Sequence, residues 1–309
     1  MEKNKPLKVL PTNDLLFQHI FGKVGNEEIT KDFLEKLLGI EIEGLTLDTN
    51  KRMQGERLED KIGRVDVKAK LTDGTVVIIE MQVAPYQQTE KRLLYYWSKA
   101  YSEGINRGDA YSKLHKTISI LITVENMEFT NGIDKYHTIW NLREKEKPEI
   151  KFSEDIEIHV IELKKFDKRT SESPEDNWIQ FINSKREGDM EELEVDKVIR
   201  KAKEEFNMLV NDEEHYEEYQ DRIDALRDQI SFLTDARDRG LTEGKAEGKA
   251  EGKAEGRAEG RAEGEKNKQI EIAKKMLAKK MNIEDIIELT RPYQKRNRKI
   301  KTFGRKGDT

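Results

Sequence analysis

Two acidic side chains interrupt apolar segments that otherwise have the composition of β-strands. Asp66 lies in GRVDVKAKL (63–71), and Glu80 lies in TVVIIEMQV (75–83). Both segments are rich in valine and isoleucine, and the turn-forming residues 72–74 separate them, so the sequence predicts a β-hairpin. A carboxylate inside an apolar strand is costly unless it has a partner, which favours a functional role for Glu80 over a solvated acidic face.

The length of the turn decides whether the two acids meet. A three-residue loop pairs Asp66 with Glu80 on one face, where directly opposed Cβ atoms are ~4.5–5.5 Å apart. Gly74 suits the left-handed backbone position that such a loop requires. A two-residue loop would instead turn the acids to opposite faces of the sheet.

Two carboxylates at this separation predict a metal site. Mg²⁺ or another hard divalent cation takes oxygen ligands and keeps several waters beside one or two carboxylates. Such a cation activates water and neutralises charge on a phosphoryl group. Gln82, on the face of Glu80, carries an amide that can orient the water, and Lys68, on the face of Asp66, can place a cation near a scissile phosphate. A solvated acidic pair is the plain alternative, and for Asp66 alone the two interpretations are balanced.

Longer motifs carry a family resemblance. The pattern of Asp66, thirteen residues and then Glu80-Met-Gln82 resembles the PD-(D/E)xK nuclease motif. The chain more closely resembles the recombination-promoting nucleases, a transposase-like family of that superfamily. The resemblance covers about residues 1–290 and rests on PTNDLLFQHIFG (11–22), RVDVKA (64–69), IIEMQV (78–83), RLLYY (92–96) and the Gly- and Glu-rich tail.

The resemblance implies an endonuclease that hydrolyses phosphodiester bonds in DNA, uses Mg²⁺ and is linked to DNA recombination. Asp66 and Glu80 would bind the metal. Gln82 occupies the position of the superfamily's lysine, which leaves Lys68 as our candidate for that role. The Arg-x-x-x-Tyr pair Arg92 and Tyr96 would contact the active centre or the DNA backbone, although packing is the alternative for the tyrosine.

A third acid is also expected near the metal. Asp14, in the Thr-Asn-Asp segment at a helix start, matches a family position, but a helix-capping role is an equal alternative. Glu56 is a further candidate. Thr12 is the residue from which we expect the first helix to be capped.

The order of helical and strand-like segments predicts an α/β domain over residues 1–166, a restriction-endonuclease-like mixed sheet flanked by helices. A charged helical region follows (167–240), and then an EG[KR]A repeat spacer (241–266), which we interpret as a linker or a marginal helix. A short helical pair (267–290) precedes a basic tail (291–309). We hypothesise that a frameshift near residue 290 produced this tail, which gene sequencing would test.

Composition limits the remaining functions. Of 309 residues, 39% are charged and 35% hydrophobic, and the net charge of −5 means that any DNA contact must use a local basic patch. The absence of cysteine excludes disulfides, thiolate zinc sites and cysteine nucleophiles. We expect a cytoplasmic protein without a membrane span. We also expect a homo-oligomer assembled through the C-terminal helices.

Two other functions compete with a nuclease. One is a catalytically inactive DNA-binding or assembly protein that keeps the nuclease fold, an alternative that Gln82 in the lysine position supports. The other is a helical interaction protein whose N-terminal domain only anchors the tail.

Overall fold

The structure is a computed structural model that describes residues 4–48, 65–83, 88–167, 169, 172–193 and 196–290. The sequence also predicts a strand over residues 45–53, of which 49–53 lie outside the described residues, as do Glu56 and the basic tail 291–309. The chain divides into two compact units, Met1–Ile230 and Ser231–Thr309. In the part of the chain that is described, no helix has the length and apolar character needed to cross a membrane.

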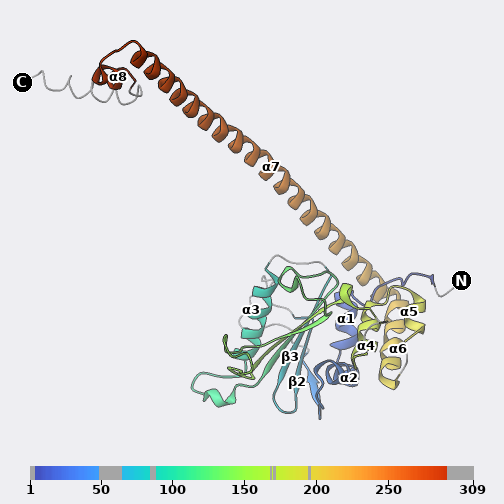
Figure 1. The fold of residues 1–309 in the computed structure, drawn as a ribbon. Coiled ribbons are helices and arrows are strands. Elements are labelled where there is room, and N and C mark those ends of the chain that lie inside the picture. The colour runs from blue at the N-terminus through green and yellow to red at the C-terminus, as the bar shows by residue number, and fades with distance from the viewer. Residues whose placement is uncertain are drawn as a thin grey trace, which may run out of the picture. The chain divides into compact units, whose positions relative to one another are not determined.

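The first unit is built on a mixed six-stranded sheet with the order β1-β2-β3-β4-β6-β5 (Figure 1). Strands β1, β2 and β3 are antiparallel, β3, β4 and β6 are parallel, and β5 is antiparallel to β6. The strands are β1 (Leu45–Leu47), β2 (Val67–Leu71), β3 (Val76–Gln82), β4 (Thr117–Thr123), β5 (His137–Trp140) and β6 (Ile156–Glu162). This architecture confirms the predicted α/β fold with a mixed sheet.

Helices cover the two faces of the sheet unequally. Their bounds are α1 (Asp14–Phe21), α2 (Glu27–Leu38), α3 (Thr89–Ser102), α4 (Asp176–Asn183), α5 (Glu187–Glu191), α6 (Lys197–Asn211), α7 (Glu213–Ala278) and α8 (Ile283–Thr290). Short 3-10 turns are η2 (Tyr111–Lys113), η3 (Glu128–Thr130) and η4 (Leu163–Lys165). Helix α3 lies alone on one face, whereas α1, α2, α4 and α6 pack on the other.

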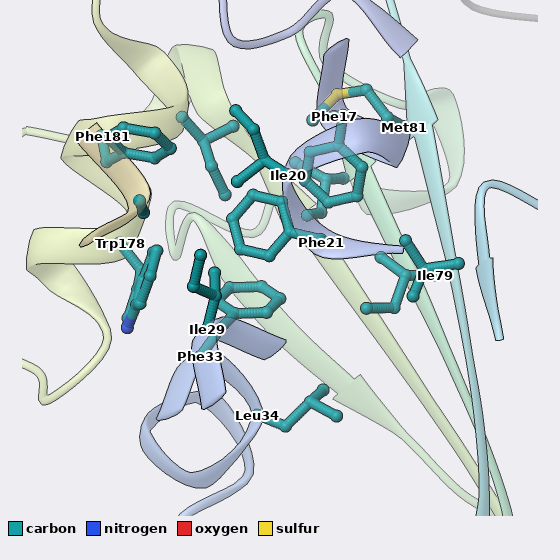
Figure 2. Close-up of a cluster of buried hydrophobic side chains, with 14 of the residues drawn as sticks. Phe17, Ile20, Phe21, Ile29, Phe33, Leu34, Ile79, Met81, Trp178 and Phe181 are labelled. Atoms are coloured by element: carbon teal, nitrogen blue, oxygen red, sulfur yellow. The ribbon is translucent and has the colours of Figure 1, made fainter. Parts of the chain in front are cut away.

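The larger core lies between the sheet and the helices of the second face. Figure 2 shows aromatic rings of α1, α2 and α4 meeting there, with Phe21, Phe33 and Trp178 all fully buried. Burying one such side chain stabilises the fold by ~1.5–3 kcal/mol. Because α4 and α6 contribute to this core, the compact unit extends well beyond the expected boundary at residue 166.

Local residues explain where the first helices begin and end. Asn13 caps α1, because its side chain accepts a hydrogen bond from the Leu16 N–H group. The prediction that Thr12 is the cap is therefore wrong by one residue. Gly39 ends α2 in a left-handed conformation (φ 65°), and a glycine directly after the apolar residues Leu37 and Leu38 predicts a helix end at this position.

The charged C-terminal region is more regular than expected. The repeat that we interpreted as a linker or a marginal helix is part of α7, which continues through residues 213–278. Residues 241–266 are exposed throughout, so no packing of that segment against the rest of the described chain stabilises it. Helix α7 ends at Ala278 and α8 begins at Ile283, so the segment 267–290 is divided near Asn282, but its first part is the end of the long α7 and not a separate short helix.

The turn between β2 and β3 sets the register of the hairpin. Val67 pairs with Ile79 and Lys68 with Ile78, so paired residue numbers sum to 146, as the three-residue loop requires. The Leu71 N–H group donates to the Thr75 carbonyl at 2.8 Å and closes the loop. Gly74 has φ 92°, the left-handed region that favours glycine. The register predicted from the turn residues is confirmed.

Replacing Gly74 by alanine is expected to destabilise the protein by at least ~1–2 kcal/mol. The backbone is left-handed, and the added Cβ would lie 2.5 Å from the ring of His115. Gly108 is the matched control, because its φ is similar (94°) but no atom lies within 4 Å of a Cβ built there. Urea denaturation should show a larger loss for G74A than for G108A. Equal losses would mean that the His115 contact adds nothing.

Candidate active site

Asp66 and Glu80 meet at one end of the β2–β3 hairpin. Asp66 directly precedes β2, and the register places it opposite Glu80, the fifth residue of β3. Glu80 and Gln82 alternate with Val77, Ile79 and Met81, which belong to the large core, so the two polar side chains lie on the α3 face of the sheet. Asp66, Glu80 and Gln82 are all buried.

Two fixed donors orient the Asp66 carboxylate. Its Oδ2 accepts a hydrogen bond from the Met81 N–H group at 2.6 Å, and its Oδ1 accepts one from Gln18 Nε2 at 2.8 Å. The first bond joins Asp66 to the residue after Glu80, and the second joins it to α1. Charge-assisted bonds of this kind hold a carboxylate in one orientation.

The Glu80 carboxylate is less well satisfied. Its Oε2 pairs with Arg92 at 3.2 Å, whereas its buried Oε1 has no hydrogen-bond partner among the described residues. Burial and, second, the neighbouring Asp66 carboxylate raise the pKa of Glu80 well above its ordinary value, and Arg92 opposes them. The Gln82 Oε1 atom is likewise buried without a partner in the described part of the chain.

Helix α3 supplies a positively charged side chain, Arg92, to this site. Arg92 contacts Glu80 and lies over the Tyr96 ring, with the guanidinium carbon 5.1 Å from the ring centroid. Tyr96 is itself buried, packed with Val65 and Ile78, whereas Tyr95 is exposed. The geometry assigns Arg92 to the acid pair, and it assigns Tyr96 to the support of Arg92.

The structure does not bring Lys68 to the acid pair. Its ammonium group lies 2.6 Å from Glu103 and 3.5 Å from Asp48. Glu103 ends α3, eleven residues after Arg92, which corresponds to about 16 Å along a helix. Among the described residues, Lys68 therefore pairs with the carboxylates of Glu103 and Asp48, at the C-terminal end of α3, whereas Glu80 pairs with Arg92 near the N-terminal end of that helix.

Asp14 is held by a residue from the far end of the domain. Arg222 on α7 donates to both Asp14 oxygens, from Nε at 2.9 and 2.8 Å and from Nη2 to Oδ2. Asp14 also lies close enough to Glu80 to raise the pKa of that group. Asn13 and not Asp14 is the N-cap of α1, but Asp14 Oδ1 also accepts a hydrogen bond from the first-turn Leu15 N–H group at 3.0 Å.

Removing the Arg222 guanidinium is expected to destabilise the first unit by about 1 kcal/mol, because the half-buried Asp14 loses its partner. Arg227 on the same helix pairs with Asp224, and both side chains are largely exposed. R227Q should therefore change stability by less than ~0.5 kcal/mol. A double-mutant cycle of R222Q and D14N, followed by chemical denaturation, measures the coupling, and a coupling of zero would contradict the prediction.

The site contains residues that the sequence did not single out. Gln18 lies one helical turn after Asp14, so a search for polar residues at i and i+4 on the first helix would have found it. Arg222 is 208 residues from Asp14, and no local pattern connects them. Among the described residues, no group of three or more His, Asp or Glu side chains is arranged to hold a metal ion. Glu56 lies outside them.

Comparison with known proteins adds one finding. The family model described as PD-(D/E)XK nuclease family transposase matches residues 11–236. The match runs from the segment before α1 into α7 and so includes the helix that carries Arg222. No curated protein and no solved structure was found to match the chain.

Proposed function

Because the chain belongs to the PD-(D/E)XK nuclease family transposases, we propose that it is a metal-dependent DNA endonuclease that hydrolyses phosphodiester bonds. Asp66 and Glu80 are the proposed ligands of Mg²⁺ or another hard divalent cation. We further propose that cleavage serves DNA recombination, that the protein acts in the cytoplasm, and that its C-terminal helices join copies of the chain.

The unpartnered Glu80 Oε1 is the observation that carries the proposal. A buried carboxylate oxygen without a hydrogen bond beside a second buried carboxylate is unfavourable in its charged form, and it is stabilised either by protonation or by a cation that shares the site. Gln82 Oε1, two residues further along the same face, is a second buried oxygen without a partner in the described chain. Oxygen atoms of this kind are the ligands that hard divalent cations prefer, so the donor set fits such an ion.

Each residue of the site has a distinct task. A bound divalent cation would supply positive charge at a scissile phosphate and lower the pKa of water. Glu80 must release its proton before it can act as a ligand, and its raised pKa makes this step depend on pH. The hydrogen bonds from the Met81 N–H group and Gln18 hold the Asp66 carboxylate in one orientation beside Glu80.

Two other residues limit what the site can do. The side chain of Gln82 has no ionisable group, so it can orient a water molecule but cannot take a proton from it. Arg92 is partly exposed, so the side of its guanidinium turned away from Glu80 can contact the DNA backbone.

Nicking of supercoiled plasmid DNA tests the function. The full chain should convert supercoiled plasmid to the nicked form with Mg²⁺ and should leave it intact with EDTA. Cleavage that persists in EDTA would contradict a metal-dependent reaction.

A catalytically inactive DNA-binding or assembly protein remains the second candidate. It is favoured by Gln82 in the position of the family's lysine and by the engagement of Lys68 with Glu103 and Asp48. Gel-shift binding of DNA without nicking under any divalent cation would support this candidate over the nuclease.

A further inference from the structure

An apolar cavity lies on the α3 face of the sheet, between the first turns of α3 and the strands β5 and β6. Its volume is about 310 Å³, and its walls include Leu93 of α3, Phe129, Trp140 of β5, and Ile158 and Val160 of β6. Pockets for small molecules span ~300–1,000 Å³, so this cavity suits a ligand with a single ring system.

The cavity lies on the same face of the sheet as Glu80, two strands away from it. Glu80 on β3 pairs with Leu121 on β4, which pairs with Val160 on β6. All three side chains lie on the α3 face, and adjacent strands are ~4.8 Å apart, so the cavity wall begins about 10 Å from Glu80. A stacked nucleic-acid strand advances ~3.4 Å per nucleotide, so this distance corresponds to about three nucleotides, and fewer when the strand is unstacked.

The lining has the chemistry of a base-stacking surface. Trp140 is 39% exposed, and its indole N–H donates to Thr138 Oγ1 at 3.0 Å, which fixes the ring. Phe129 meets this ring edge to face at a centroid distance of 6.1 Å. Glu90 and Asn141 add polar groups to the same lining, and such groups can accept or donate hydrogen bonds at a base edge.

We propose that this cavity binds one unpaired nucleobase of the DNA strand that is cut. The proposal rests on the proposed endonuclease function and narrows its substrate class. A paired base is stacked on both faces and cannot enter the cavity, whereas a bulged or single-stranded base can stack on Trp140. The protein should therefore prefer DNA with an unpaired nucleotide within about three nucleotides of the scissile phosphate.

Binding in EDTA tests the cavity separately from cleavage. The probe is a duplex with 2-aminopurine in a single-nucleotide bulge, compared with the fully paired duplex. We expect the wild type to quench the bulged base, and W140A to lose the quenching and bind this probe roughly tenfold more weakly. W140F should retain most of the binding. F152A is the control, because Phe152 lies in the connection that joins β5 to β6, is 84% exposed and does not line the cavity.

The outcomes separate the two proposals. If W140A binds and quenches the bulged probe as the wild type does, or if F152A weakens binding equally, the cavity proposal is overturned. If W140A changes the oligomeric state in sedimentation, the cavity is an interface between copies and the proposal is also overturned. If Trp140-dependent quenching occurs but no metal supports nicking, the nuclease function fails while the base-binding cavity stands.

Discussion

Replacing Glu80 by glutamine should abolish metal-dependent cleavage and, at the same time, make the metal-free protein more stable at neutral pH. Because Glu80 is a proposed ligand of the catalytic cation, its loss should lower the rate of DNA cleavage at least ~10²–10³-fold, as the removal of a key electrostatic group does. The charged Glu80 carboxylate, buried beside Asp66, destabilises the folded state. The neutral glutamine should therefore increase the free energy of unfolding by on the order of 1–3 kcal/mol.

The stability that E80Q gains over the wild type should increase as the pH rises. Because the folded-state pKa of Glu80 lies above its unfolded value of ~4.3, the folded wild type holds the proton more tightly. Its stability relative to E80Q therefore falls as pH rises from about 4 through the raised pKa. Thermal denaturation in EDTA should give similar midpoints for the two proteins near pH 4. At pH 7.5 the midpoint of E80Q should be higher, by ~2–4 °C per kcal/mol.

Mg²⁺ provides the matched control for this variant. A cation that binds the folded state at one hundred times its Kd stabilises the protein by ~2.7 kcal/mol. Mg²⁺ should therefore raise the midpoint of the wild type and leave that of E80Q unchanged. If E80Q were less stable than the wild type in EDTA at pH 7.5, the carboxylate would be a stabilising group and the cation argument would be wrong.

Asp66 should behave differently from Glu80, because its carboxylate is part of the hydrogen-bond framework. D66A leaves the Met81 N–H group and Gln18 without their acceptor and should destabilise the protein by ~1–3 kcal/mol. D66N retains one oxygen to accept from Met81, so most of the stability should return. Both variants should lose cleavage at least ~10²-fold, because the amide supplies no charge to a cation.

Asp73 offers a control in the same hairpin. It is exposed, and its Oδ1 accepts a hydrogen bond from the nearby Thr75 N–H group at 2.8 Å. D73N should change stability by less than ~0.5 kcal/mol and leave nicking unaffected. Chemical denaturation and plasmid nicking of D66A, D66N and D73N together test whether Asp66 contributes to both stability and cleavage. A D66A protein as stable as the wild type would show that the two hydrogen bonds contribute little.

Local chemistry explains which features could be predicted from the sequence. The sequence left two hairpin registers open, and Gly74 suited the three-residue loop that the structure contains, because few residues other than glycine tolerate its left-handed backbone; this register places Asp66 opposite Glu80. The end of α2 followed from Gly39 in the same way. Features of this kind depend on a few adjacent residues, so the sequence contains all the information they need.

Features that depend on distant residues were not predictable in this way. Strand β5 has only four residues, and α4 has eight, too few for a periodic pattern to stand out. The pairing of Lys68 with Glu103 was missed because alternation predicted only the face of the strand and not the partner across it. Arg222 was missed because α7 is placed against α1 only by the folded core.

The contribution of α4, α6 and the start of α7 to one core bears on how the protein can be dissected. A fragment that ends at residue 166 would leave Phe21 and Phe33 without the covering rings of Trp178 and Phe181. The exposed hydrophobic surface would promote aggregation. It would also lack Tyr219, whose hydroxyl bonds His19 of α1 at 2.7 Å. The shortest fragment suited to crystals or assays therefore runs to about Ile230, although the acid pair, Gln82, Arg92 and Tyr96 all lie before residue 100.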